Sequence, residues 1–267
     1  MCGLTGFWTK ETMQNAKMNR IITFMSDSIS HRGPDQGNIW TDCQNGIAFG
    51  HRRLSIVDLS EKGNQPMVSS NGKLVIIYNG EIYNHKEIRT LLENKGIVFK
   101  GYSDTEVLLE ACSLWGIERT LNYLNGMFAF AIWNREEKKI SLVRDRLGIK
   151  PLYYGYINKT FFFGSQPKSF FHHPAWKAEI DRESIDWALR HSYIPAPKSV
   201  YKGLSQLMPG TIINFDNLGN ITKKNYWKAA DFKKNYNENS NSLNFYKEKL
   251  DLLLNESVKK RMISEVP

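Results

Sequence analysis

Apolar residues form short runs separated by turn-forming residues over much of the first 165 positions. Asn79 and Gly80 close the first long run, and Asn134 and Asn158 separate later ones. Residues 127–164 are therefore expected to form an antiparallel meander. The runs that predict β-strands are Leu74–Tyr78, Met127–Trp133, Lys139–Val143, Pro151–Ile157 and Thr160–Gly164.

Between these runs, apolar residues recur at the spacing of amphipathic α-helices. Such a mixture of strands and helices indicates a layered α/β domain. A stretch rich in Asn, Ser and Lys, residues 233–242, predicts a linker. After it, apolar positions from Leu243 to Val258 predict a long amphipathic helix, which about 25 residues cannot bury alone. We therefore expect its packing partner outside this sequence. The earlier helical positions are Ile21, Ile22, Met25 and Ile29, then Ile88, Leu91 and Leu92 before Gly96, then Val107, Leu108 and Ala111.

The composition is that of a packed domain, with 41% hydrophobic residues in 267 positions. The longest apolar run, residues 127–133, is far shorter than the ~18 residues that indicate a membrane span, so no membrane partner is expected. The N-terminus has no basic segment followed by an apolar one, which predicts a cytoplasmic protein. The three cysteines form no C-x-x-C pair, so neither a disulfide framework nor a metal site is expected.

The net charge of +9 raises the question of nucleic-acid binding. Residues 221–267 contain ten basic and six acidic side chains, so four of the nine excess charges lie in that segment. No arginine stripe or aromatic platform accompanies the charge. We therefore expect no nucleic-acid partner, and a basic binding module with an inert Cys2 stays as an alternative.

Cys2 follows the initiator methionine and is a candidate nucleophile. If Met1 is removed, the thiol shares its residue with a free α-amine, whose ordinary pKa of about 7.7–8.0 suits a general base. An acyl-transfer site at the mature N-terminus then needs no histidine. A thiol hydrolase that uses His31 or His51 instead is a further alternative.

Several polar residues could complete a site for a small amide. The Asn79 amide and the Gly80 N–H could stabilise an oxyanion, although Asn-Gly also forms ordinary turns. Arg53 could bind a substrate carboxylate in bidentate fashion, or be a solvated arginine. Asp104 could pair with a substrate ammonium, but Ser103 and Glu106 around it also fit a helix capping box.

Six short motifs carry a resemblance to a known family. Through them, residues 1 to about 227 resemble the glutaminase domain of glutamine-dependent asparagine synthetases. That domain is a class II glutamine amidotransferase of the N-terminal-nucleophile hydrolase superfamily. In order, the motifs are Met1-Cys2-Gly3, His31-Arg32-Gly33-Pro34-Asp35, Gly50-His51-Arg52-Arg53-Leu54-Ser55-Ile56-Val57, Tyr78-Asn79-Gly80-Glu81-Ile82-Tyr83-Asn84, Ser103-Asp104-Thr105-Glu106 and Arg144 to Tyr154.

The resemblance implies that Met1 is removed and that Cys2 attacks the side-chain amide of glutamine. It also implies an α+β fold, the four-layer αββα sandwich. The segments His31–Asp35 and Arg144–Lys150 would then be structural. The remaining implied roles are the oxyanion hole for Asn79 and Gly80, carboxylate binding for Arg53, pocket lining for Leu54, Ser55, Ile56 and Val57, and ammonium binding for Glu81 and Asp104.

The same resemblance implies a glutaminase domain at 1–227, a linker at 228–242, and the start of a C-terminal α/β synthetase domain at 243–267. No cofactor is expected in this chain. ATP and Mg are expected for the missing synthetase domain, which would use aspartate, and a homodimer is possible. As an alternative, the same glutaminase could feed the amidation of another carboxylate, on a sugar or a peptide.

Overall fold

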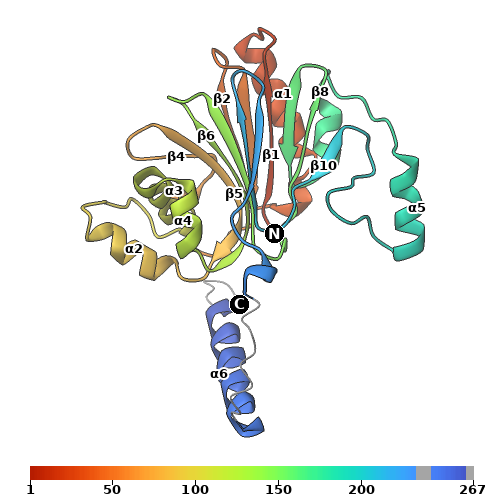
Figure 1. The fold of residues 1–267 in the computed structure, drawn as a ribbon. Helices are drawn as coiled ribbons and strands as arrows, with labels where there is room; N and C mark the ends of the chain where they lie inside the picture. Colours follow the sequence, from red (N-terminus) through yellow and green to blue (C-terminus); the bar gives the residue numbers. More distant parts are fainter. Residues whose placement is uncertain (233–241, 263–267) are drawn as a thin grey trace.

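Two antiparallel β-sheets of six strands each form the centre of the structure (Figure 1). The computed structural model describes residues 1–232 and 242–262. The first sheet has the order β10-β8-β9-β1-β3-β2. Its strands are β1 (Gly3–Thr9), β2 (Gln36–Asp42), β3 (Ile47–Arg53), β8 (Tyr153–Ile157), β9 (Thr160–Gly164) and β10 (Leu204–Gln206). The second sheet, in the order β12-β11-β7-β6-β5-β4, comprises β4 (Met67–Val68), β5 (Leu74–Ile82), β6 (Gly126–Asn134), β7 (Lys139–Arg144), β11 (Thr211–Asp216) and β12 (Ile221–Asn225).

Helices cover the outer faces of both sheets, so the layers are αββα, as the resemblance implies. Helix α1 (Asn15–Asp27) packs Met18 and Ile22 against Phe7 of the first sheet. Helices α2 (His85–Glu93), α3 (Asp104–Trp115) and α4 (Ile117–Tyr123) cover the second sheet. The remaining helices are α5 (Arg182–His191), α6 (Leu243–Arg261) and the short 3-10 helices at Ser30–Arg32, Glu61–Gly63, Pro167–His172 and Ala229–Phe232.

The main hydrophobic core lies between the two sheets. Alternating side chains of both sheets fill it, because successive residues of a strand point to opposite faces. Buried apolar side chains from the first sheet meet a matching set from the second. The core includes Leu4, Phe49 and Phe163 from the first sheet, with Ile77, Ala131 and Leu142 from the second.

The predicted meander over residues 127–164 is wrong. β6 pairs with β7 in the second sheet, whereas β8 pairs with β9 in the first. The chain crosses from the second sheet to the first after β7, and hydrogen bonds of Arg144 and Asp145 stabilise this connection. Arg144 donates to the carbonyls of Lys150, Gly148 and Leu207 at 2.6–2.8 Å. This network redirects the chain, so two predicted hairpins belong to different sheets.

Asn79 and Gly80 do not form a turn, which corrects the predicted end of the strand at Tyr78. β5 continues to Ile82, and Asn79 and Gly80 pair with β6 opposite Ala129 and Phe128. A Cβ at Gly80 would lie 2.3 Å from the Met127 carbonyl oxygen, so the close strand pairing requires glycine there.

The predicted helices exist, and α6 extends the last of them to Arg261. Figure 1 shows α6 projecting away from the sandwich, and its apolar side chains, including Leu250 and Leu253, are exposed. Residues 233–241 of the predicted linker and 263–267 lie outside the described residues. In the part of the chain that the structure describes, no helix is both long and apolar enough to cross a membrane.

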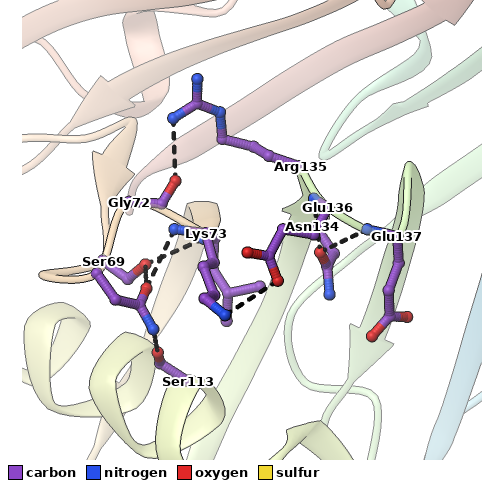
Figure 2. Close-up of polar contacts among 10 residues, drawn as sticks. Ser69, Gly72, Lys73, Ser113, Asn134, Arg135, Glu136 and Glu137 are labelled. Carbon is purple, nitrogen blue, oxygen red and sulfur yellow. Dashed lines mark hydrogen bonds and ion pairs between the residues drawn. The ribbon is translucent and has the colours of Figure 1, made fainter.

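Two neighbouring turns, which we call the distal turns, contain residues 69–73 before β5 and 134–138 after β6. Figure 2 shows Arg135 reaching across to the Gly72 carbonyl, a hydrogen bond of 2.9 Å. Lys73 forms an ion pair with Glu136 at 3.1 Å, and the Asn71 amide donates to Ser113 of α3 at 2.8 Å. These contacts tie the start of β5 to the β6–β7 turn and to α3.

Candidate active site

A cavity opens where the start of β1, the end of β3, the end of β5 and the start of α3 come together. Every residue that the sequence proposed for the site lines it except Ser55. The Ser55 N–H instead donates to Asp35 at 2.8 Å. The lining residues are Met1, Cys2, Arg53, Leu54, Ile56, Val57, Gly63, Gln65, Tyr78, Asn79, Gly80, Glu81, Ser103, Asp104, Thr105 and Lys150.

The Cys2 thiol lies against the backbone of Leu54. The Leu54 N–H donates to Sγ at 3.4 Å, and the thiol donates to the Leu54 carbonyl at 3.5 Å. Burial raises the pKa of the Cys2 thiol, and the hydrogen bond from Leu54 opposes that shift. In the described chain the terminal amine belongs to Met1, and burial lowers its pKa. Removal of Met1 would place an α-amine on Cys2 itself, next to a thiol that needs a base.

Arg32 belongs to a motif that the resemblance treated as structural, yet it contacts the proposed nucleophile. Its Nε donates to the Cys2 carbonyl at 3.0 Å and fixes the backbone of the N-terminal residues. Sequence reasoning missed this contact because it joins residues 30 positions apart.

The Asn79 side chain is the clearest candidate for an oxyanion donor. It is 1% exposed, and its Nδ2 has no hydrogen-bond partner among the residues that the structure describes. An unsatisfied buried amide costs about 1–3 kcal/mol, so native proteins rarely keep one without a purpose. Gly80 lies beside it on the same strand and also lines the cavity. The pair fits the stabilisation of a developing negative charge on a bound carbonyl oxygen.

The Ser103–Glu106 segment forms a helix cap and also places a carboxylate in the cavity. Ser103 caps α3, since its Oγ accepts from the Glu106 N–H at 3.3 Å. Asp104 lies in the cavity and accepts from the Tyr78 hydroxyl at 2.7 Å and from the Ile82 N–H at 2.9 Å. Burial raises the pKa of Asp104, and these two hydrogen bonds oppose the shift. Capping and site chemistry therefore use adjacent residues.

Arg53 is buried rather than solvated, and its guanidinium organises the loop that follows β3. Its terminal nitrogens donate to the Ser60 carbonyl at 2.9 Å, to Asn64 at 3.1 Å and to Gln36 at 3.1 Å, and also to the carbonyls of Val57 and Asp58. The guanidinium thereby shapes the wall that Leu54, Ile56 and Val57 provide. A substrate carboxylate would have to displace at least one of these acceptors.

Glu81 and Lys150 bring opposite charges to the same cavity. Burial raises the pKa of Glu81, and the charge of Lys150 opposes this. Lys150 was expected to be structural, and its position in a polar turn gives no sequence signal for burial. Gln65 was also missed; it accepts from the Tyr78 N–H at 2.6 Å and donates to Thr105 at 3.2 Å.

The alternative of a cysteine–histidine pair finds no support in the described residues. His51 Nε2 lies 2.9 Å from the Tyr78 carbonyl, and burial lowers the pKa of His51 to about 4. Neither His31 nor His51 lines the cavity. Within residues 1–232 and 242–262, no group of three or more His, Cys, Asp or Glu side chains could hold a metal ion.

Comparison with known proteins agrees with this geometry. The profile of the glutamine amidotransferase domain matches residues 1–227. The chain belongs to the glutamine amidotransferase domain family. The family assignment covers both sheets and every residue that lines the cavity.

Similar curated proteins are named as asparagine synthetases. Glutamine-hydrolysing asparagine synthetases 3 and 1 of Bacillus subtilis are 35% and 38% identical to this family member over its whole length. A putative glutamine-hydrolysing asparagine synthetase of Methanocaldococcus jannaschii is 33% identical. The chain spans 42%, 41% and 53% of the lengths of these three relatives.

Solved structures support the fold. An allosteric regulatory enzyme of purine biosynthesis matches 85% of this chain and 49% of its own, with a TM-score of 0.63 and 23% identity. A glutamine phosphoribosylpyrophosphate amidotransferase from B. subtilis, with the same coverage, has a TM-score of 0.60 and 22% identity. At this identity the likeness concerns the fold alone.

Proposed function

We propose that this domain hydrolyses glutamine to glutamate and ammonia with Cys2 as the nucleophile, after removal of Met1. The terminal amine of Cys2 takes the thiol proton, and Sγ attacks the side-chain amide carbon. The tetrahedral intermediate collapses with cleavage of the C–N bond, and the protonated amine returns its proton to the departing ammonia. Water then hydrolyses the thioester, which releases glutamate and restores the thiol.

The unpartnered, buried Nδ2 of Asn79 is the observation that carries this proposal. In the proposed reaction Asn79 and Gly80 would donate hydrogen bonds to the oxyanion. The Asn79 Nδ2 would then gain a hydrogen-bond partner. Donors that are fixed before the reaction stabilise the transition state without reorganisation. The family assignment independently points to glutamine as the amide substrate.

The charged cavity residues suit the α-amino acid part of glutamine. We assign Asp104 and Glu81 to its ammonium and Arg53 to its carboxylate, the last with rearrangement of the loop at 57–64. The backbone at Leu54, Ile56 and Val57 would line the side-chain channel. Two carboxylates and two cations, Arg53 and Lys150, together balance the charges of a zwitterionic substrate.

We further propose that the ammonia feeds an ATP-dependent synthetase that makes asparagine from aspartate in the cytoplasm. The names of the curated relatives support this acceptor. In this scheme residues 1–227 form the glutaminase, 228–242 the linker, and α6 begins the synthetase domain. ATP and Mg²⁺ would then be used by that second domain.

The glutaminase is tested with intact mass to verify loss of Met1, followed by glutamate and ammonia release from glutamine. We expect turnover in the wild type and none in Cys2→Ala. A wild type that lacks Met1 and leaves glutamine intact would reject the proposal. Asparagine formation from aspartate, ATP and glutamine in the longer protein tests the acceptor separately.

A further inference from the structure

Lys150 is a buried cation in the cavity that takes part in no proton transfer of the proposed reaction. Its residue is 5% exposed and lines the cavity together with Cys2 and Glu81. Among the described residues, no carboxylate lies within the 4.0 Å of an ion pair with its ammonium. Burying a lysine without a close partner is costly, so the position calls for an explanation beyond packing.

The local backbone places Lys150 there. Its N–H donates to the Asp145 carboxylate at 3.0 Å, and its carbonyl accepts from Arg144 Nε at 2.8 Å. Asp145 also accepts from the N–H groups of Leu147 and Ile149 at 3.0 Å. Several hydrogen bonds thus fix the turn between β7 and β8, from which the Lys150 side chain lines the cavity.

Several carboxylates lie near the N-terminal end of the chain. Glu81 and Asp104 line the same cavity, and Asp35 lies near the N-terminus. Carboxylates near an amine favour its protonated form, which cannot accept a proton. Arg32 and Lys150 supply positive charge against these carboxylates, and the Arg32 guanidinium is held by its hydrogen bond to the Cys2 carbonyl.

We propose that Lys150 is a positioning residue whose ammonium, once Met1 is removed, keeps the α-amine of Cys2 in its neutral, proton-accepting form against the carboxylates of the cavity. The same positive charge favours the thiolate over the thiol. Removing it would therefore shift both groups toward their protonated, inactive forms. This inference rests on the proposed function, because it assigns Lys150 to the amine that serves as the base.

The electrostatics of the site agree with this geometry. With Met1 in place, burial is the largest cause that lowers the pKa of the Met1 amine, and the charges of Arg32 and Lys150 lower it further, so both cations act at this end of the chain. Burial lowers the pKa of Lys150 itself, whereas Glu81 and Cys2 oppose that shift. The charged and titratable groups that act on the amine, Cys2 and Lys150 are Arg32, Asp35, Arg53, Glu81, Asp104 and Asp145.

The test compares Lys150→Met with Lys150→Arg in the full 267-residue chain, after intact mass has verified loss of Met1. The readouts are the pH dependence of Cys2 alkylation by iodoacetamide and the acid limb of kcat/KM for glutamine. For Lys150→Met we expect both midpoints to rise by roughly 0.5–1 pH unit, the effect of one partly screened charge. Lys150→Arg keeps the charge and should keep midpoints close to those of the wild type.

Lys139→Met removes a partly exposed lysine near the distal turns, which pairs with Glu137, and serves as the matched control, with unchanged midpoints expected. If Lys150→Met does not fold, Lys150→Gln replaces it. The inference is overturned if the midpoints of the uncharged variant stay within about 0.2 pH unit of the wild-type values. It is also overturned if the midpoints of Lys150→Arg shift as far as those of Lys150→Met. Alkylation of Cys2 requires no turnover. If the wild type shows no glutaminase activity, the proposed function is rejected, but the pH dependence of alkylation still tests the role of Lys150.

Discussion

Strand β5 begins at the distal turns and ends in the cavity, so one strand connects two polar regions of different character. At the distal turns, polar groups satisfy one another: Arg135 binds Gly72, Lys73 pairs with Glu136, and Asn71 donates to Ser113. In the cavity, among the described residues, the buried Asn79 Nδ2 has no hydrogen-bond partner and Lys150 has no carboxylate within ion-pair distance. The satisfied polar groups at the distal turns support the fold, whereas the unsatisfied amide and the unpaired cation line the same cavity as the proposed nucleophile.

The largest effect is expected for Asn79→Ala. Removing an oxyanion donor should lower kcat for glutamine by on the order of 100- to 1,000-fold, with a small change in KM. The free energy of unfolding should not fall through a lost hydrogen bond, because Nδ2 has no partner among the described residues. Steady-state kinetics and urea unfolding measure the two quantities.

Asn71→Ala is the matched control at the other end of β5, where the amide is hydrogen-bonded. It should leave kcat unchanged. If Asn79→Ala instead lost stability and kept its kcat, the assignment of Asn79 to the oxyanion would be wrong.

A smaller kinetic effect is expected for Asp104→Asn. The substitution keeps the size of the side chain but removes the charge proposed to bind the substrate ammonium. We expect kcat/KM for glutamine to fall by roughly 10- to 100-fold, mostly through KM. Ser103→Ala separates capping from binding, because it should cost about 1 kcal/mol of stability with a much smaller change in KM. Equal changes of KM in both variants would contradict a binding role for Asp104.

Glu110→Gln tests a buried carboxylate that is fully satisfied. Glu110 of α3 accepts from the Ser70 N–H at 2.7 Å and from the Ser70 hydroxyl at 2.8 Å, next to the distal turns. An amide can accept only one of these bonds well, so the free energy of unfolding should fall by about 1–2 kcal/mol. The kinetic constants of the remaining folded protein should match the wild type. A loss of kcat at equal folded fraction would break the separation between the two ends of β5.

The sequence predicted the periodic elements, and all but one of the proposed site residues line a single cavity, for reasons that are local. Asn79, Gly80 and Asp104 stand in contiguous motifs, so their neighbours along the chain define them. The meander failed because the crossing between the sheets depends on Arg144 binding the Leu207 carbonyl, 63 residues away. The site role of Lys150 was not predicted, because its burial results from tertiary contacts and a lysine in a polar turn is usually solvated.

The smallest effect is expected for Lys73→Met at the distal turns. The ion pair between Lys73 and Glu136 is exposed, with half or more of each side chain accessible to solvent. Exposed pairs contribute little because water screens the charges and ordering two long side chains costs entropy. The free energy of unfolding should change by less than about 0.5 kcal/mol, and the kinetics of glutamine hydrolysis should not change. A shift in the pH midpoint of Cys2 alkylation in this variant would show that charges at the start of β5 reach the cavity, and the contrast between its two ends would then fail.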